Sequence, residues 1–406
     1  MHIHLLRPND IHPPHWYGVA RYATELVSAI TDLYPSVSFS SFHCSLRRRV
    51  PLKRKTDLAK SGVELRAIPL PDFSRSVLYN QILEKWCMPS WVQQAGCDIS
   101  WGTNCSALPK STRPFRTVVT IHDLFLLTHP ELSESYFSTS VGPRLQQTAE
   151  QVDLILTDSQ FTKKQIVEIL GIDPEKVLVT HLGVSSELYH SIRNHGGIPS
   201  SHEKRKDEPL PLPFASVSHL LEKKPLLSVG TIEPRKNYEL GLFVYRDLLR
   251  LLPDLPPWVI IGNNGWKFDR FYRTREQLKL EDHVHVISGM TDNVLHRFYH
   301  SSHCLFCPSL IEGFGLPVLE AMTTGLPVVC STGGSLPEIG GEAVISIPPH
   351  DKDGFVESLH RIFTKPELKQ KLAQQGLQRA QLFSWENAAT QVIQAFQNLL
   401  NNEHLS

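Results

Sequence analysis

The chain has 406 residues, of which 41% are hydrophobic and 20% charged, as in an ordinary soluble globular protein. Its 41 basic and 41 acidic residues cancel, so no overall field attracts nucleic acid. The N-terminal residues do not resemble a secretory signal, and no apolar run is long enough to span a membrane. The seven scattered cysteines argue against a disulfide framework. We therefore expect a cytoplasmic protein of two or three domains.

The first half of the chain alternates short β-rich runs with longer amphipathic stretches, which is typical of an α/β protein with parallel sheets. A helix is predicted over residues 19–33, because apolar residues recur there at three- and four-residue steps. The predicted strands of this half begin at His2, Val37, Asp98, Thr117, Leu154 and Val177.

Between residues 191 and 225 the periodicity fails, and the stretch is rich in Pro, Gly, Ser and charge, as a linker should be. The α/β alternation then starts again with six further β-rich runs, and a final helix is expected after Ser384, a suitable N-cap. The sequence thus predicts two doubly wound Rossmann-like domains, residues 1–215 and 216–387. Residues 388–406 form a C-terminal helix that can cross back to the first domain.

The segment PSLIEGFGLPVLEAMTTGLPVV, residues 308–329, carries the most information about function. It predicts a strand, a glycine-containing loop and a helix, and such a loop lies at the carboxyl end of a strand, where ligands bind. Gly313 and Gly315 let the backbone approach a ligand, and the helix start offers N–H groups to a phosphate. Glu312 and Glu320 add carboxylates that suit pairs of sugar hydroxyls, although two solvated glutamates remain the alternative.

The E-x7-E spacing from Glu312 to Glu320, with GFGLP between, resembles the signature of the retaining nucleotide-sugar glycosyltransferases of family 4. The resemblance extends over residues 226–396 and is fainter at GVARYATEL, TIHD and LTDSQFT in the first half. It implies an α/β GT-B fold, in which two Rossmann-like domains face each other across a cleft. Bacterial exopolysaccharide and envelope-polysaccharide glycosyltransferases are the subgroup that the chain resembles.

A second loop, SVGTIEPRKN, follows the first predicted strand of the second domain and carries Arg235 and Lys236. Such cations can neutralise a diphosphate, although two solvated basic residues would also fit. In the family, an arginine commonly stands where this chain has Thr231, and Lys236 keeps the position of the family's lysine. The resemblance therefore implies that Arg235 supplies the missing charge.

In the first domain, His122 ends a predicted strand at its carboxyl end, and Gly18 precedes the first helix. By resemblance, His122 faces the cleft near the reacting centre, and the backbone at Gly18 approaches the donor phosphates. Most histidines are structural or exposed, and that reading stays open. In the second domain, Gly289 and Met290 match the place where the nucleobase meets the backbone.

The resemblance also implies roles within the E-x7-E segment. Glu320 would hold the ribose hydroxyls, and Glu312 would hold the donor sugar. The N–H groups of the loop would hold sugar and phosphate, at Gly313, Phe314, Gly315 and Leu316. The reaction would need no cofactor and no metal, because cationic side chains and the helix N-terminus would stabilise the leaving diphosphate.

Two other motifs imitate metal or redox sites. Cys304 and Cys307 form a lone C-x-x-C inside a β-rich run, where buried strand cysteines are the simpler interpretation. Asp351 and Asp353 imitate a D-x-D metal motif, but they stand just before an amphipathic stretch. We expect Asp353 to cap that helix.

The sharpest charge cluster is RRRVPLKRK, Arg47 to Lys55. It predicts either a solvated loop or a peripheral contact with an anionic membrane surface, which would suit an enzyme with a lipid-linked acceptor. No aromatic residues interleave the cluster, so nucleic acid is a poorer partner.

These features together predict a metal-independent, retaining hexosyltransferase of polysaccharide biosynthesis. Its donor would be a nucleotide sugar, UDP-glucose in the first place and GDP-mannose next. Its acceptor would be a growing or lipid-linked oligosaccharide. The alternatives are a GT-B sugar-nucleotide epimerase and a non-catalytic subunit that binds nucleotide sugars.

Overall fold

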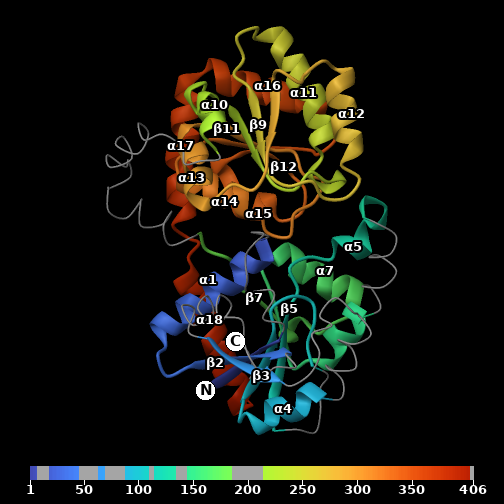
Figure 1. The fold of residues 1–406 in the computed structure, drawn as a ribbon, viewed down its shortest axis with the longest axis vertical. Helices are drawn as coiled ribbons and strands as arrows, with labels where there is room; N and C mark the ends of the chain where they lie inside the picture. The colour runs from blue at the N-terminus through green and yellow to red at the C-terminus, as the bar shows by residue number, and fades with distance from the viewer. Residues whose placement is uncertain are drawn as a thin grey trace. The chain divides into compact units, whose positions relative to one another are not determined.

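The computed structural model describes residues 1–6, 18–44, 63–68, 87–108, 114–133, 144–184 and 214–402. The chain divides into two compact units (Figure 1). The first unit comprises Met1–Thr128, Ser135–Gly183 and Ser384–Ser406, and the second comprises His129–Glu134 and Val184–Phe383. The units therefore change at Gly183 and Phe383, whereas the sequence analysis placed the boundaries at 215 and 387. Most of the expected linker lies outside the described residues.

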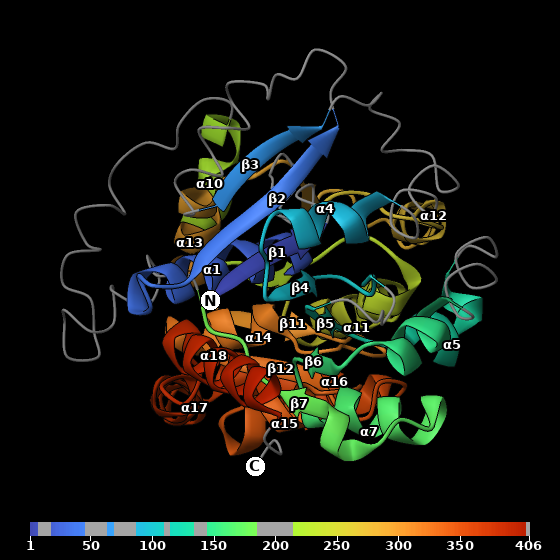
Figure 2. The same cartoon turned by 90° about the horizontal axis from the view of Figure 1, so that it is seen from below.

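The first unit contains a seven-stranded sheet in which every strand pairs in parallel with its neighbours. Its order is β3-β2-β1-β4-β5-β6-β7, and Figure 2 shows the strands in this succession. Strand β1 pairs with β4 so that Leu5 lies opposite Trp101. The strands are β1 (His2–Leu6), β2 (Ser38–Cys44), β3 (Val63–Ile68), β4 (Ile99–Gly102), β5 (Arg116–Thr120), β6 (Leu154–Thr157) and β7 (Val177–Val179).

The helices of the first unit include α18, which comes from the far end of the chain. Helix α18 packs along α1, and Phe396 on α18 meets Trp101 of β4 with ring centroids 5.5 Å apart (Figures 1 and 2). The N-cap predicted for α18 is confirmed, because the Ser384 side chain accepts a hydrogen bond from the backbone of Asn387. The α-helices whose ends both lie in the described residues are α1 (Gly18–Leu33), α4 (Met88–Gln94), α5 (Phe125–Thr128), α7 (Gln160–Leu170) and α18 (Trp385–Asn401), and residues 144–151 are helical as well.

The second unit contains a six-stranded parallel sheet in the order β10-β9-β8-β11-β12-β13. Its strands are β8 (Leu226–Val229), β9 (Trp258–Ile261), β10 (Val284–Ile287), β11 (Cys304–Cys307), β12 (Val328–Ser331) and β13 (Ile345–Ile347). Its α-helices are α10 (Ser218–Glu222), α11 (Tyr238–Leu251), α12 (Asp269–Gln277), α13 (Asp292–Ser301), α14 (Leu316–Thr323), α15 (Leu336–Gly340), α16 (Lys352–Thr364) and α17 (Pro366–Ala380).

Helices cover both faces of this sheet. Helices α11, α12 and α16 share one buried core cluster with the strands, centred on Trp258. Trp258 stacks on Tyr245 and contacts Phe306, with ring centroids 6.0 and 5.7 Å apart. Helices α13, α14 and α17 lie on the other side of the sheet (Figure 1). The two α/β units of the sequence prediction are thus confirmed, each with a parallel sheet.

The second unit also takes in a short segment from the first half of the chain, His129–Glu134. The indole N–H of Trp266 donates to the Leu132 carbonyl at 2.6 Å, and the Lys267 ammonium donates to the Glu131 carbonyl at 2.8 Å. The chain therefore crosses to the second unit soon after β5 and α5, long before the main crossing after Gly183.

The strand orders locate the edge of each sheet where a site is expected. In the second unit the order reverses between β8 and β11, and in the first unit between β1 and β4. Ligands of open α/β sheets bind beyond the carboxyl ends of the strands at such a reversal. The loops that follow β8 and β11 contain Arg235, Lys236 and Glu312.

Candidate active site

Three charged side chains meet at the carboxyl ends of β8 and β11. The Lys236 ammonium donates to Oε1 of Glu312 at 2.6 Å. The Arg235 guanidinium donates from Nη1 to Oε2 of Glu312 at 2.9 Å. The two carboxylate oxygens are thus held by different cations, and residues that lie 76 and 77 positions apart in the sequence form one cluster.

Glu312 is buried and remains an anion. Burial raises its pKa, but the charges of Lys236 and Arg235 and the hydrogen bonds from Lys236 and Ser309 lower it to about 2. Ser309 Oγ donates to Oε1 at 2.6 Å. A carboxylate offers about four acceptor positions, so these three donors leave about one for a ligand.

Arg235 is bound by a second buried carboxylate. Its Nε and Nη2 approach Oε1 of Glu233 at 2.9 and 2.8 Å, and Nη1 also reaches the Ile311 carbonyl at 3.3 Å. Most of the guanidinium is therefore used within the protein. By contrast, Lys236 donates one of its three N–H groups to Glu312 and keeps two for a ligand. The two carboxylates balance the two cations.

Glycines make room for this cluster at two places. Gly230 has φ +148°, and a Cβ there would lie 2.9 Å from Cε of Lys236. Gly334 has φ +73°, and a Cβ there would lie 2.2 Å from the Glu312 carbonyl oxygen. In addition, the Ser335 hydroxyl donates to that carbonyl oxygen at 3.0 Å. The Glu312 loop is therefore held on both its backbone and its side chain.

The loop ends at helix α14, which begins at Leu316 after Gly315 in the left-handed conformation. Gly313, Phe314 and Gly315 are buried, and the N-cap residue, Gly315, has no side chain with which to cap the first turn of the helix. An uncapped helix start favours an anion. The helix is followed by Gly325 at C′, where φ is +69°.

Glu320 lies one turn into α14 and is also buried. The hydroxyl of Tyr299, which is fully buried on α13, donates to Oε2 of Glu320 at 2.6 Å. Met290, where the nucleobase contact was expected, lies in the short loop between β10 and α13 and is half-buried. Gly289 beside it has φ +71° and open space around it. The expected base and ribose contacts thus belong to the same unit.

In the first unit, His122 follows β5 and is held at both ring nitrogens. Its Nδ1 lies 2.6 Å from Oδ2 of Asp158, which follows β6, and its Nε2 lies 2.9 Å from the Thr103 carbonyl, which follows β4. The edge of the Tyr22 ring packs against the imidazole, with centroids 4.8 Å apart. Gly18 lies on α1, one turn before Tyr22.

The partners of His122 determine its charge. Burial lowers its pKa, but the Asp158 carboxylate and the hydrogen bonds that the imidazole donates to Asp158 and to the Thr103 carbonyl raise it, and the pKa of His122 is above its ordinary value. A carbonyl and an ionised carboxylate only accept hydrogen bonds, so both ring nitrogens donate when Asp158 is charged. The imidazole then has no lone pair with which to accept a proton.

The alternative motifs have structural explanations. Cys304 and Cys307 are buried in β11, and burial raises the pKa of their thiols to about 12 and about 11. No cluster of His, Cys, Asp or Glu suited to a metal ion occurs among the described residues. The helix cap was assigned to the wrong aspartate: α16 begins at Lys352, so Asp351 is the N-cap and accepts from the Gly354 N–H at 2.9 Å. Asp353 points into solvent.

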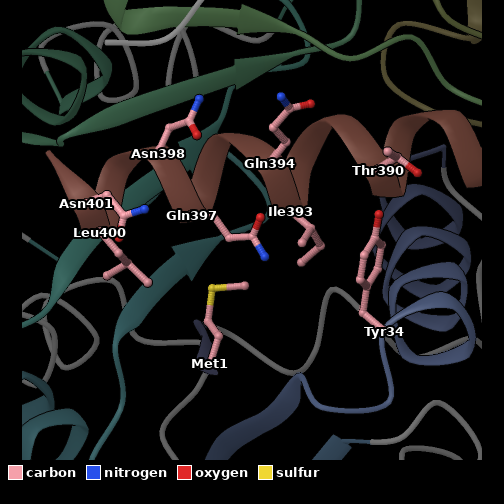
Figure 3. Close-up of a pocket in the computed structure, with 9 residues that line it drawn as sticks. All are labelled: Met1, Tyr34, Thr390, Ile393, Gln394, Gln397, Asn398, Leu400 and Asn401. Carbon is pink, nitrogen blue, oxygen red and sulfur yellow. The ribbon is translucent and has the colours of Figure 1, made fainter. Parts of the chain in front are cut away.

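Two further features are separate from these clusters. A cavity of about 680 Å³ lies along α18, with Met1, Tyr34 and Gln397 among the side chains that line it, and contains none of the predicted site residues (Figure 3). The basic segment Arg47–Lys55 lies outside the described residues. No helix within the described ranges combines the length and the apolar character that crossing a membrane requires.

Four side chains that contact predicted residues were not themselves predicted from the sequence. Glu233 and Ser309 stand in the same loops as Arg235 and Glu312, whereas Tyr299 comes from α13 and Asp158 from the end of β6. Glu233 stands in the EPRKN motif itself, and Asp158 in the segment LTDSQFT, so the sequence contained a signal for these two. No pattern in the sequence marks Tyr299 as a partner of Glu320.

Comparisons with known proteins agree for both halves of the chain. Residues 16–188 match the model for Glycosyltransferase Family 4, and residues 214–379 match that for Glycosyl transferases group 1. The chain is 29% identical to the O-antigen chain mannosyltransferase B of Escherichia coli over 390 residues, 94% of this chain and 96% of that protein.

Two solved structures resemble the fold over nearly the whole chain. The sucrose-phosphate synthase of Thermosynechococcus elongatus has a TM-score of 0.75 at 17% identity, covering 99% of this chain and all of that one. Anabaena Alr3699/HepE, in complex with UDP and glucose, has a TM-score of 0.65 at 16% identity, covering 98% of this chain and all of that one. At these identities the likeness concerns the fold alone.

Proposed function

This chain belongs to glycosyltransferase family 4 and has the GT-B fold, and from that premise we propose that it transfers a hexose from a nucleoside diphosphate sugar to a growing polysaccharide. The observation that supports this activity most strongly is the cluster of Lys236, Arg235 and Glu312 beside the start of α14. A fixed ammonium with unused donors next to an uncapped helix start suits the diphosphate that leaves when the sugar is transferred.

In the proposed mechanism, Lys236 and the N–H groups at the start of α14 bind the diphosphate and stabilise the charge that grows on it. Glu233 holds Arg235, Arg235 holds Glu312, and Glu312 in turn orients Lys236. The remaining acceptor position of Glu312 takes a hydroxyl of the donor sugar. Because these groups are already in place, little reorganisation is needed in the transition state.

Glu320 accepts hydrogen bonds from the ribose hydroxyls, and the backbone near Met290 contacts the base. The acceptor binds to the first unit, where both ring nitrogens of His122 are engaged in hydrogen bonds and His122 therefore does not serve as a general base. We propose retention of the anomeric configuration, with the departing phosphate oxygen accepting the proton of the acceptor hydroxyl. No side chain is required to form a covalent intermediate with the sugar.

For the donor we propose GDP-mannose, with UDP-glucose as the second candidate. The full-length likeness to a mannosyltransferase of O-antigen chains favours mannose and a polysaccharide acceptor. UDP-glucose is the donor that the envelope-polysaccharide resemblance favoured. The cluster of Lys236, Arg235 and Glu312 would serve either donor, since the leaving group is a nucleoside diphosphate in both cases.

The acceptor class also connects to the basic segment. If the acceptor is lipid-linked, Arg47–Lys55 would hold the enzyme at an anionic membrane surface by a contact that salt weakens. Replacing the six basic residues of this segment with glutamine should reduce sedimentation with anionic vesicles at low salt. Hydrolysis of the donor in solution should stay unchanged, because that reaction needs no membrane.

One assay separates the proposed reaction from its alternatives. The protein is incubated with GDP-mannose or UDP-glucose, with and without a mannan or glucan oligosaccharide, and the products are followed by NMR. Transfer predicts release of nucleoside diphosphate that rises with acceptor, and an α-glycoside from these α-configured donors. Formation of an epimer without acceptor would indicate an epimerase, and binding without turnover of either donor would indicate a non-catalytic subunit.

A further inference from the structure

Tyr299 and Glu320 form a buried hydrogen-bonded pair that no sequence motif predicts. Tyr299 lies on α13 and is fully buried, and Glu320 lies on α14 and is 3% exposed. The phenol hydroxyl and Oε2 are 2.6 Å apart. This distance is typical of a short O–H···O⁻ bond, in which the phenol donates and the carboxylate accepts.

The energetics of burial explain why the two residues need each other. A buried tyrosine hydroxyl normally finds a partner, and a buried carboxylate is costly unless donors satisfy it. The hydroxyl of Tyr299 meets both needs, since it favours the ionised form of Glu320 and restricts its rotamer. Each oxygen of a carboxylate can accept more than one hydrogen bond, so the bond from Tyr299 does not exclude a bond from a ribose hydroxyl.

Helix α13 connects Tyr299 to the loop where the nucleobase contact is expected. The loop that carries Met290 leads directly into α13, and Tyr299 lies in the last turn of that helix. Helix α13 therefore joins the expected base contact at one end to the side chain that holds Glu320 at the other. A displacement of α13 would move both contacts together.

We propose that Tyr299 is a positioning residue for the nucleotide: its hydroxyl orients Glu320 toward the ribose hydroxyls of the donor. This inference rests on the proposed ribose contact of Glu320. It assigns the donor's ribose hydroxyls as the groups for which this buried pair is arranged. Tyr299 itself touches no substrate and acts only through Glu320.

The test compares nucleotide affinities by calorimetry in the full chain. Tyr299→Phe keeps the buried ring and removes only the hydroxyl, so the dissociation constants of GDP and UDP should rise about tenfold for whichever nucleotide binds. The same variant should bind 2′,3′-dideoxy GDP or UDP as the wild type does, because the ribose hydroxyls are missing. KM for the donor should rise with little change in kcat, as for a uniform binding contact.

Two controls separate positioning from stability. Tyr245→Phe removes the hydroxyl of an equally buried tyrosine of the same unit, which donates to the Pro256 carbonyl at 2.9 Å. It should lower the melting temperature without changing nucleotide affinity. In a double-mutant cycle, Tyr299→Phe should cost nothing further once Glu320→Ala is present, because the hydroxyl acts through that carboxylate alone.

The outcomes are distinguishable from a failure of the ribose assignment. Wild-type affinity in Tyr299→Phe together with weakened affinity in Glu320→Ala overturns the positioning role and leaves the ribose contact intact. Unchanged affinity in a folded Glu320→Ala overturns the ribose contact itself. If Tyr299→Phe does not fold, the comparison is made in the Glu320→Gln background, where no buried charge loses its donor. A smaller preference for ribose over dideoxyribose in Tyr299→Phe/Glu320→Gln than in Glu320→Gln supports the proposal, and an equal preference overturns it.

Discussion

The two units hold their charged residues in different ways. In the second unit, Glu312 is shared by two cations, and Lys236 keeps N–H groups with which to bind an anion. In the first unit, both ring nitrogens of His122 form hydrogen bonds, one with Asp158 and one with a backbone carbonyl. The second unit is therefore built to offer charge to a ligand, whereas the first holds an imidazole in one orientation. Stabilisation of the leaving group should therefore depend on Lys236 in the second unit. The pH dependence of the rate should depend on His122 and its orientation in the first unit.

The largest effect on kcat is expected when the Lys236 ammonium is removed. Lys236→Ala should lower kcat by about a hundredfold or more, because charge on the leaving diphosphate peaks in the transition state. Arg235→Ala should lower kcat less, since that side chain mainly holds Glu312 and Glu233. Lys371→Ala, at an exposed position on α17, is the matched control and should turn over normally. Equal kcat in Lys236→Ala and wild type would remove the leaving-group role.

The contact between His122 and Asp158 should affect the pH dependence of the rate. Asp158→Asn should lower kcat about ten- to hundredfold, because the imidazole loses its orientation. Asp158 raises the pKa of His122, and an imidazolium is lost as the pH rises through that pKa. The alkaline limb of the rate profile should therefore move to lower pH in Asp158→Asn. Asp173→Asn, which alters an exposed cap, should leave the limb in place. A limb that is the same in all three proteins would show that another group titrates.

A smaller effect concerns acid stability. The folded-state pKa of Glu312 is about 2, below its ordinary value of 4.5. A group with a lowered pKa contributes stability that is present above the unfolded pKa and is lost as the pH falls toward the folded pKa. The loss between about pH 4.5 and 2 should be roughly 3 kcal/mol, and it should be missing in Glu312→Gln. Parallel pH curves of unfolding free energy for the two proteins would contradict the ion-pair account.

The smallest effects are expected at the D-x-D sequence. Activity should survive EDTA, because Lys236 and the start of α14 supply the positive charge. Asp351→Ala should destabilise α16 by about 1 kcal/mol and leave turnover unchanged, and Asp353→Asn should change neither quantity. Activity that EDTA abolishes and manganese restores would refute metal independence.

Much of the fold could be predicted because buried parallel strands are short apolar runs with recognisable ends. The exception is β3, Val63–Ile68, which pairs with β2 at the end of the sheet as far as the structure describes it, and which carries Glu64 and Arg66. Edge strands often bear charged side chains, and their apolar signal is correspondingly weak. The cap of α16 was misassigned because two aspartates stand one residue apart and only the position of the first turn distinguishes them.

The site was predictable residue by residue but not as a network. Arg235, Lys236 and Glu312 were identified from two loops, and the parallel sheet brings the loops together because β8 and β11 are neighbours. The contact of Tyr299 with Glu320 depends on how α13 and α14 pack, which no local pattern records. The two hydrogen bonds of the His122 ring likewise depend on the order of β4, β5 and β6 in the sheet.

The most direct test of the central claim compares nucleoside diphosphates with monophosphates. If Lys236 and the start of α14 form the diphosphate site, GDP or UDP should bind the wild-type protein much more tightly than GMP or UMP in calorimetry. This difference should shrink about tenfold or more in Lys236→Ala, while monophosphate affinity stays the same. A diphosphate preference of equal size in both proteins would contradict the account.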